Sequence, residues 1–323
     1  MTIIERAEER NQTPIMEFIL LGFGDVGELQ PLLFLVFLAI YIVTLAGNVL
    51  VILLVVTDQQ LHTPMYFLLG NLAFLETCYS STILPRLLAS LLTRNRTVSI
   101  KGCVVQLYFF AVISATENLL LAAMSYDRYL AICHPLRYAA LMNGRVCIKL
   151  VAGCWISSFL GCAIVNNFLF QLSYCDFNEI NHFFCDLSPM LKLSCDDTQS
   201  LQILAYTLAA IGTLVPCLLT LASYVCIITA ILQIPSSTGR KKAFSTCSSH
   251  LIVVTFYYGL VINVYVVPIA NSSQVVHKIF SVFYTILTPM INPIIYCLRN
   301  KEVNKSLRKA SLNLTDLTNK YRT

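Results

Sequence analysis

Long apolar segments alternate with short polar ones along the whole chain. Residues 32–56 contain no charged side chain, and neither do the runs 201–239 and 243–277. A helix that crosses a bilayer needs about 20 predominantly apolar residues. The pattern therefore predicts seven membrane-spanning helices, over residues 32–56, 65–92, 102–125, 151–171, 201–239, 243–277 and 279–298.

The composition excludes a water-soluble protein. Of the 323 residues, 57% are hydrophobic and 12% are charged, and the mean hydropathy is +0.70. So few charged side chains cannot cover the surface of a soluble protein. The net charge of +5 does not indicate nucleic-acid binding, because no run of five basic residues occurs. The expected fold class is an all-α membrane protein, a seven-transmembrane helix bundle.

Basic residues set the expected orientation, because cytoplasmic segments carry the excess of Lys and Arg. They concentrate after the third and fifth predicted spans and in the tail, which places the N-terminus outside. We expect an extracellular segment over 1–28 without a cleavable signal peptide, a membrane domain over 29–298, and a cytoplasmic tail over 299–323 with a short helix. Asn-x-Ser/Thr sites in the outer segments predict glycosylation of Asn11, Asn95 and Asn271.

A glycine-rich stretch near the start imitates a dinucleotide-binding turn. Gly22, Gly24 and Gly27 match the GxGxxG spacing. However, no acid lies between Glu28 and Asp58 to bind a ribose, and the next helix is a membrane span. We interpret this stretch as a flexible outer segment that leads into the membrane.

Four cysteines lie where oxidation is expected. Cys103 opens the third span, and Cys175, Cys185 and Cys195 lie in the long loop after the fourth span. Two disulfides can use all four, and spacing alone permits three pairings. His182, Cys185 and Asp186 also have metal-binding chemistry, but an oxidised cysteine offers no thiolate. We therefore favour a disulfide-bonded loop with a surface histidine and predict no metal site there.

Residues on four predicted spans resemble those of rhodopsin-like G-protein-coupled receptors. They are Asn48 mid-way in the first span, Asp127-Arg128-Tyr129 at the end of the third, Trp155 in the fourth, and Asn292-Pro293-Ile-Ile-Tyr296 near the end of the seventh. Longer motifs resemble those of the olfactory receptors, and their residues are similar to the tetrapod class of that family. They are Pro64-Met-Tyr-Phe-Leu68, Met124-Ser-Tyr-Asp-Arg-Tyr-Leu-Ala-Ile-Cys-His-Pro-Leu-Arg-Tyr138, Lys242-Ala-Phe-Ser-Thr-Cys-Ser-Ser-His250 and Pro289-Met-Ile-Asn-Pro-Ile-Ile-Tyr296. The resemblance runs from about residue 18 to residue 309.

This resemblance implies an odorant receptor in the plasma membrane of olfactory cilia. Such a receptor binds a small volatile ligand and activates a heterotrimeric stimulatory G protein of the olfactory type, which raises cyclic AMP. The resemblance also implies the pairing of Cys103 with Cys185 and of Cys175 with Cys195. The usual aspartate of the second helix is replaced here by Glu76.

Two carboxylates lie inside predicted spans, away from the ends. An ionised side chain there costs at least about 3 kcal/mol, so Glu76 and Glu117 need partners. A sodium ion or a proton shared by these acids, with Asn48, Ser125 and Asn292 nearby, is the interpretation that we favour, and the family resemblance implies a sodium-type site there. Neutral, hydrogen-bonded acids that serve only packing are the alternative.

Helical spacing groups candidate ligand contacts on three faces. Apolar walls with a few hydroxyl and amide groups suit a small, mostly apolar ligand, whereas plain helix packing is the alternative. The absence of an acid in the outer half of the third helix argues against an amine ligand. The three faces are Phe110, Ala111, Ser114 and Asn118; Ala205, Leu208, Ala209 and Gly212; and Tyr258, Val261, Ile262 and Tyr265.

Arg128 is a permanent cation at the cytoplasmic edge, next to Asp127 and Tyr129. By family resemblance, Tyr224 and Tyr296 take over its hydrogen bonding when the helices rearrange, which makes a two-state switch. The alternative is a charge that serves topology only. Tyr258 before Gly259 is expected to couple the ligand to motion of the sixth helix.

Three other classes of protein compete with this interpretation. A channel or transporter would also place ionisable groups in the membrane, but no matching halves with broken helices are visible. An intramembrane hydrolase needs a buried base, whereas all five histidines are expected at loops or span ends: His62, His134, His182, His250 and His277. A receptor for a non-odorant small molecule is the nearest rival.

Overall fold

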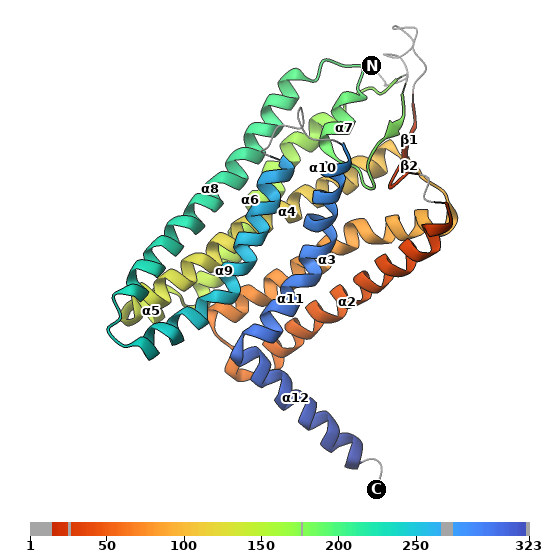
Figure 1. Cartoon of the computed structure of the whole chain (residues 1–323). Helices are drawn as coiled ribbons and strands as arrows, with labels where there is room; N and C mark the ends of the chain where they lie inside the picture. Colours follow the sequence, from red (N-terminus) through yellow and green to blue (C-terminus); the bar gives the residue numbers. More distant parts are fainter. Residues whose placement is uncertain (1–14, 25–26, 176, 266–273, 321–323) are drawn as a thin grey trace. The chain divides into compact units, whose positions relative to one another are not determined.

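The computed structural model describes residues 15–24, 27–175, 177–265 and 274–320, with the elements labelled in Figure 1. In this part of the chain, six stretches of helix are long and apolar enough to cross a membrane. A seventh span results when the two bent segments of α9, 237–245 and 247–263, are taken together. The first five correspond to α2 (Gln30–Thr57, with the short helix η1, Gly27–Leu29, before it), α3 (Pro64–Thr93), α4 (Ile100–Cys133), α6 (Gly144–Leu169) and α8 (Gln199–Leu232).

The last span is built from three consecutive elements. They are α10 (Gln274–Val282), the π-helical turn η4 (Phe283–Leu287) and α11 (Thr288–Arg299), and the apolar span runs over 278–297. The helix α12 (Lys301–Lys320) follows as the predicted helix after the final span. The prediction of a seven-helix membrane bundle is confirmed.

Two predicted boundaries were wrong. The apolar run 201–239 ends as a helix at Leu232, because Pro235 cannot continue the hydrogen-bonding ladder and disfavours helical backbone in the residue before it. A new helix, α9 (Ser237–Tyr265), starts two residues after Pro235 and includes the basic Arg240 and Lys241. The end of the run 243–277 belongs to α10 instead of α9.

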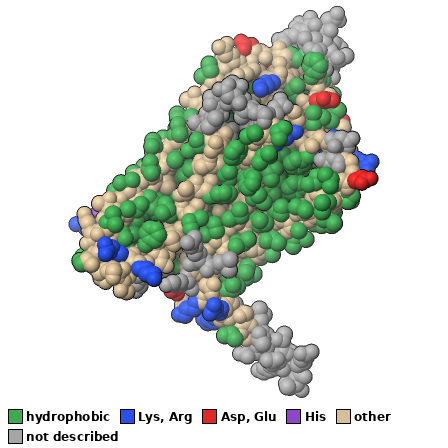
Figure 2. Space-filling model, viewed as in Figure 1, with side chains coloured by type: hydrophobic (Ala, Val, Ile, Leu, Met, Phe, Trp, Pro, Cys, Tyr) green, Lys and Arg blue, Asp and Glu red, His purple; other side chains and the backbone are tan. Residues whose placement is uncertain are grey.

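The side chains are distributed as expected for a protein whose solvent is lipid. Hydrophobic side chains form a broad patch on the face that is visible in Figure 2. On α2 alone, Leu32, Leu35, Ile42 and Leu53 are more than half exposed. The buried positions of the spans include the polar residues Thr44, Asn48, Glu76, Glu117, Asn118, Ser125 and Asn292. Exposed apolar and buried polar side chains are the arrangement that a hydrocarbon environment favours.

Contacts divide the chain into two compact units. Unit 1 comprises the described residues of Met1–Tyr41, Cys78–Thr116 and Cys154–Leu214. Unit 2 comprises those of Ile42–Thr77, Glu117–Gly153 and Val215–Thr323. The helices α2, α3, α4, α6 and α8 each contribute one part to each unit, whereas α9 to α12 belong to unit 2.

A small sheet in unit 1 precedes the glycine-rich stretch. The strand β1 (Glu17–Leu20) pairs antiparallel with β2 (Thr97–Ser99) and parallel with β3 (Glu179–Ile180), in the order β2-β1-β3. The turn that follows β1 then places the ring of Phe23 between those of Phe37 and Phe183, at centroid distances of 5.5 and 5.3 Å.

The glycines of the imitated nucleotide motif serve this turn. Gly22 and Gly24 have φ values of +60° and +85°, which side chains rarely tolerate. The amide of Gly22 donates to the carbonyl of His182 at 3.0 Å, and Arg96 donates to the carbonyl of Gly24 at 2.8 Å. In the described part of the glycine-rich stretch, the partners of Gly22 and Gly24 therefore lie far away in sequence.

Two disulfides fix the long loop of unit 1. Cys103 is bonded to Cys185, with their Cα atoms 5.4 Å apart, and Cys175 to Cys195, at 6.0 Å. The first ties α4 to the loop, and the second joins the two ends of the part of the loop that contains α7 (Leu187–Lys192). This is the pairing that the resemblance implied among the three that spacing permits.

In unit 2, α2 and α11 approach closely. The side-chain amide of Asn48 donates to the carbonyl oxygens of Thr44 and Pro289, both at 3.0 Å. A Cβ atom at Gly47 would lie 3.2 Å from Cγ of Pro293, so only glycine fits without displacement. Pro289 and Pro293 of α11 therefore contact α2 at the side-chain amide of Asn48 and at Gly47, which has no side chain.

The start of α12 is attached to the rest of unit 2. Val303 and Ser306 are buried, and Lys309 forms an ion pair of 3.7 Å with Asp58, which caps the short helix η2 (Gln59–Leu61). The hydroxyl of Tyr66 donates to Oδ1 of Asn300 at 3.1 Å. Ser306 also forms a hydrogen bond with Asp58.

Candidate functional site

A cluster of buried oxygen atoms lies where α2, α3, α4 and α11 contribute to unit 2. Glu76 and Glu117 are 1% and 3% exposed, and Asn48 and Asn292 are equally buried. The amide of Asn292 donates a hydrogen bond to the Glu76 carboxylate. The two carboxyl groups are close enough to interact electrostatically. The structure therefore brings together Glu76, Glu117 and Asn292 of the predicted ion site, while Asn48 is buried on α2 and bonded to the carbonyl of Pro289 on α11.

The atoms left over in this cluster are acceptors. Among the described residues, Glu117 Oε1, Asn48 Oδ1 and Asn292 Oδ1 are buried without a hydrogen-bond partner. Buried acceptors without donors cost free energy, and hard cations take oxygen ligands of this kind. A cation or a proton fits these oxygen atoms, since either would supply the positive partner that the acceptors lack.

Ser125, the fifth residue of the predicted ion site, belongs to a different network. Its hydroxyl donates to the carbonyl of Leu121 at 2.9 Å and lies 3.4 Å from Thr220 Oγ1 on α8. Thr220 lies 3.5 Å from the hydroxyl of Tyr258 on α9, which donates to the carbonyl of Asn118 at 3.3 Å. These buried groups connect α4, α8 and α9 within unit 2.

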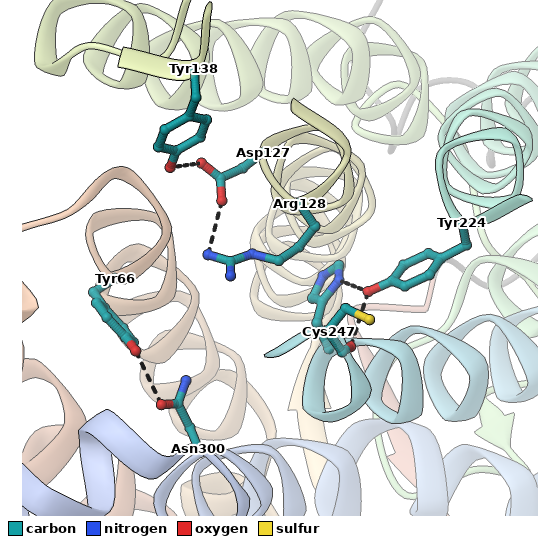
Figure 3. A network of polar contacts seen from close by, with 8 residues as sticks. Tyr66, Asp127, Arg128, Tyr138, Tyr224, Cys247 and Asn300 are labelled. Carbon is teal, nitrogen blue, oxygen red and sulfur yellow. Dashed lines mark hydrogen bonds and ion pairs between the residues drawn. The ribbon is translucent and has the colours of Figure 1, made fainter. Parts of the chain in front are cut away.

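An ion pair occupies the predicted switch (Figure 3). Arg128 Nη2 lies 3.0 Å from Asp127 Oδ2, with side-chain exposures of 13% and 0%. The hydroxyl of Tyr138, on α5 (Pro135–Leu141), donates to the other carboxylate oxygen of Asp127 at 2.7 Å. Desolvation and the neighbouring Asp127 charge raise the pKa of Tyr138, which keeps its hydroxyl a proton donor. Asp127 is thus held on both sides.

Tyr224 has partners other than Arg128 in this arrangement. Its hydroxyl shares a hydrogen bond of 2.7 Å with Nδ1 of His250 and lies 3.4 Å from the carbonyl of Cys247, both on α9 (Figure 3). His250 is 1% exposed and lies inside the helix. The expectation that every histidine lies at a loop or span end was therefore wrong for His250. It follows a stretch rich in Ser and Cys, and this local sequence does not show that the helix continues through it.

The two other residues of the predicted switch are Tyr129 and Tyr296. Tyr129 points its hydroxyl to His134 Nε2 at 2.9 Å. Tyr296 is 1% exposed, and its hydroxyl has no hydrogen-bond partner among the described residues. A buried hydroxyl without a partner is available to accept a new one when neighbouring helices move.

The predicted ligand faces divide between the units. In unit 1, Phe110 is buried against Tyr79 and Phe184, at centroid distances of 5.4 and 5.0 Å. Ala205 is buried, Ala111, Ser114, Leu208 and Gly212 are half-buried, and Ala209 is exposed. In unit 2, the buried residues are Asn118, Tyr258 and Val261, with Ile262 half-buried. The side chain of Tyr265 lies outside the described residues.

The histidine of the long outer loop, His182, is buried. His182 is 3% exposed and packs on Phe183 and Phe184, at centroid distances of 4.7 and 4.5 Å. The expected surface histidine was therefore wrong, because two adjacent aromatic rings cover the imidazole. Among the described residues, no group of three or more His, Cys, Asp and Glu side chains is arranged to hold a metal ion.

One of the three predicted glycosylation sites lies in the described residues. Asn95 is exposed between α3 and β2, and its Oδ1 accepts hydrogen bonds from the amide and the hydroxyl of Thr97, at 2.9 and 2.8 Å. Asn11 and Asn271 lie outside the described residues.

A seven-helix membrane bundle with buried carboxylates mid-span and an Asp-Arg pair near the end of one helix defines a G-protein-coupled receptor. The family model for the olfactory receptors matches residues 37–313. The human olfactory receptor 6P1 is 49% identical over 91% of this chain and 93% of its own, and the mouse olfactory receptor 5AP2 is 45% identical over 94% and 95%. The human olfactory receptor 10A5 is 47% identical over 96% and 98%.

The chain therefore belongs to the olfactory receptor family. It is a multi-pass membrane receptor for an odorant, with a G protein as its partner, and it is not an enzyme. Sequence reasoning missed His250 and Thr220 as members of the polar networks. Both follow an apolar helix pattern, and only the neighbouring helix supplies the partner that shows their role.

Proposed function

We propose that this receptor binds a small, mostly apolar volatile compound within its helices and activates a stimulatory G protein of the olfactory type, which raises cyclic AMP. The proposal places it in the plasma membrane of olfactory cilia. Its principal support is the buried chain of hydroxyls from Tyr258 through Thr220 to Ser125, which lies three residues before Arg128.

The hydroxyl chain gives ligand binding a route to the switch. A ligand that packs on the face of Tyr258 changes the position of α9, and Thr220 and Ser125 share hydrogen bonds that respond to this shift. Movement of α9 then draws His250 away from Tyr224. Tyr224 then becomes free to bond Arg128 once it leaves Asp127, as does the hydroxyl of Tyr296, which has no hydrogen-bond partner in the described part of the chain.

Ligand selectivity follows from the few polar groups on largely apolar faces. Asn118 and Tyr258 supply an amide and a hydroxyl on the unit 2 faces, whose apolar walls are Val261 and Ile262. A ligand with one hydrogen-bonding group on a small hydrocarbon frame matches this composition.

The carboxylate cluster supports a second part of the proposal. Glu76, Glu117, Asn48 and Asn292 would hold a sodium ion or a shared proton, which compensates the buried negative charge. Because the cluster involves α2, α3, α4 and α11, positive charge held there stabilises the resting arrangement of these helices. Its loss would favour rearrangement.

The experiment that tests the proposal measures cyclic AMP in cells that express the receptor with a stimulatory olfactory-type G protein. A panel of volatile compounds is applied, and the response is compared with that of Arg128→Ala at equal surface level. We expect one or more small apolar compounds to raise cyclic AMP in the wild type alone. A ligand that binds but changes only another second messenger would contradict the proposed coupling.

A receptor for a non-odorant small molecule is the alternative. Involatile ligands that outperform every volatile compound in the same assay would favour it. Expression outside the olfactory epithelium would argue against the ciliary location.

A further inference from the structure

A series of aromatic rings in unit 1 connects the N-terminal turn with one of the predicted ligand faces. Neighbouring rings have centroids 4.5 to 5.5 Å apart, within the range at which aromatic pairs attract each other. The turn after β1, the long outer loop and the helices α2, α3 and α4 all contribute to the series. In spatial order, the rings are those of Phe37, Phe23, Phe183, His182, Phe184, Phe110 and Tyr79.

Phe23 is held in this series by its ring and by the backbone of its turn. The ring is nearly parallel to those of Phe37 and Phe183, with interplanar angles of 15° and 12°. The amide of the preceding residue, Gly22, donates to the carbonyl of His182 at 3.0 Å. The turn is therefore bonded to the same loop segment on which the ring of Phe23 packs.

The middle of the series is buried in the long outer loop. His182, Phe183 and Phe184 are 3%, 3% and 1% exposed. The centroids of Phe183 and Phe184 lie 5.1 Å apart, and their planes meet at 61°. Because protein interiors are close-packed, a ring in this group cannot move without displacing its neighbour. The position of Phe183 therefore decides that of Phe184.

Phe184 connects the series to the ligand face of α4. Its centroid lies 5.0 Å from that of Phe110, which is 4% exposed. The next residue of the loop, Cys185, is bonded to Cys103 of α4, and its amide donates to Oε1 of Gln106 at 3.2 Å. Gln106 precedes Phe110 by four positions, which is about one helical turn. These bonds hold the loop on α4, so a shift of the Phe184 ring displaces Phe110.

We propose that Phe23 is a specificity-determining residue of this receptor, which acts by positioning Phe184 and Phe110. The proposal rests on the ligand faces of the proposed function. An apolar pocket whose side chains are fixed discriminates a single methylene group by about 10- to 200-fold. Without the ring of Phe23, its neighbours Phe37 and Phe183 face a void and relax into it. Ligands of different length are then discriminated less.

The test measures ligand binding by the full-length receptor in lipid nanodiscs. The probes are straight-chain primary alcohols from pentanol to decanol, and their Kd values come from the shift of the unfolding temperature with alcohol concentration. In Phe23→Leu, which keeps an apolar side chain but loses the stacked ring, the Kd ratio between the best-bound alcohol and its neighbour should fall by about threefold or more. Phe23→Tyr keeps the ring and should retain the wild-type ratio.

Phe177→Leu is the matched control. Phe177 belongs to the same loop and undergoes the same change of side chain, but it is 76% exposed. This variant should leave the Kd ratio unchanged. Phe110→Leu should lower the ratio as Phe23→Leu does. Because both variants act on one ligand face, the double variant should lower the ratio by less than the product of the two single factors.

Gly22→Ala tests the turn while every aromatic ring stays in the chain. A Cβ atom at Gly22 would have no atom within 4 Å, so the variant acts through the strain of a side chain at φ +60°. The strain shifts the backbone that carries Phe23. The Kd ratio should therefore fall in the same direction as in Phe23→Leu.

Three results would overturn the inference. The first is a wild-type Kd ratio in Phe23→Leu. The second is an equal loss of affinity for every alcohol in that variant, which a purely structural role of Phe23 would give. The third is a double variant whose effect equals the product of the single effects of Phe23→Leu and Phe110→Leu.

Hydrogen exchange tests the positioning without any ligand. The amides of residues 180–184 should exchange about tenfold faster in Phe23→Leu than in the wild type or in Phe177→Leu, because the loop loses the ring that packs on it. Unchanged exchange would refute the positioning by Phe23. A wild-type receptor that binds none of the alcohols would contradict the ligand class of the proposed function, and the exchange measurement would still decide the role of Phe23.

Discussion

The hydroxyl of Tyr224 on α8 and Nδ1 of His250 on α9 share a hydrogen bond of 2.7 Å inside unit 2. Their rings stack with centroids 5.9 Å apart. Because Tyr224 is engaged in this way while Arg128 pairs with Asp127, the contact holds one half of the proposed switch in its resting arrangement.

Replacement of His250 by phenylalanine should raise signalling in the absence of ligand. His250→Phe keeps an aromatic ring for the stack but removes the hydrogen bond, at a cost to the resting state of about 1 kcal/mol. Basal cyclic AMP at equal surface level is the measurement. Tyr108→Phe is the control, since its hydroxyl donates to the carbonyl of Phe159 in unit 1, outside this contact. An unchanged basal level in His250→Phe would show that Tyr224 is not restrained by the histidine.

Substitution of Arg128 distinguishes a role in the signalling switch from a role as a charge that only sets topology. Arg128→Ala should abolish cyclic AMP production while the remaining basic residues keep the orientation. Arg128→Lys preserves the charge but replaces a planar five-donor group with a point charge, so bonding to Tyr224 and Tyr296 should weaken and signalling should fall. Full signalling by Arg128→Lys would mean that charge alone suffices, and full signalling by Arg128→Ala would exclude the switch.

The carboxylate cluster can be tested by charge removal at constant size. The double variant Glu76→Gln with Glu117→Gln should lose any dependence of signalling on sodium, whereas the fold should largely persist because amides keep the volume and hydrogen bonding. The measurement is a sodium titration of basal and stimulated cyclic AMP, with choline replacing sodium at constant ionic strength. A sodium response that is the same in the wild type and the double variant would leave only the packing role.

The disulfide between Cys103 and Cys185 should be required for folding. A disulfide of this kind contributes about 2 to 5 kcal/mol, so Cys103→Ser or Cys185→Ser should block surface export. Cell-surface staining and ligand response are the measurements. Cys154→Ser, a buried cysteine outside the disulfides, is the control and should be nearly neutral. Normal export of either disulfide variant would argue against a structural role for this bond.

Acid should release the start of α12 from η2. Hydrogen bonds from Ser306 and then the amide of Gln60, together with the charge of Lys309, hold the pKa of Asp58 below its usual value of 3.8. The stabilisation is therefore complete above pH 3.8 and is lost as the pH falls through the lower pKa of the folded state.

Hydrogen exchange of residues 301–307, corrected for the intrinsic rate, measures this release. Exchange should accelerate as the pH falls from about 5 to about 3, while Asp58→Asn should exchange faster at pH 5 and change little on acidification. The same acceleration in wild type and Asp58→Asn would place the titrating group elsewhere.

The sequence by itself determined the number of spans, because transfer of an apolar segment into lipid depends on its own composition and length. It also located the two buried carboxylates and the Asp-Arg pair, since charges within apolar runs are rare and costly. The cysteines that could be oxidised were visible from their place outside the spans. Their pairing was not, because three connectivities fit the spacing, and only the approach of α4 to the loop brings Cys103 within reach of Cys185.

Only the tertiary structure decided the partners. His250 reads as a polar residue near the start of an apolar run, yet Tyr224 from α8 makes it a buried hydrogen-bond member. Ser125 sits at the right depth for the carboxylates, but Thr220 lies beside it. The glycines before α2 form an ordered turn because Phe37 and Phe183 accept Phe23 between them. Each case depends on contacts between residues distant in sequence, which periodicity and composition do not encode, because they describe one segment at a time.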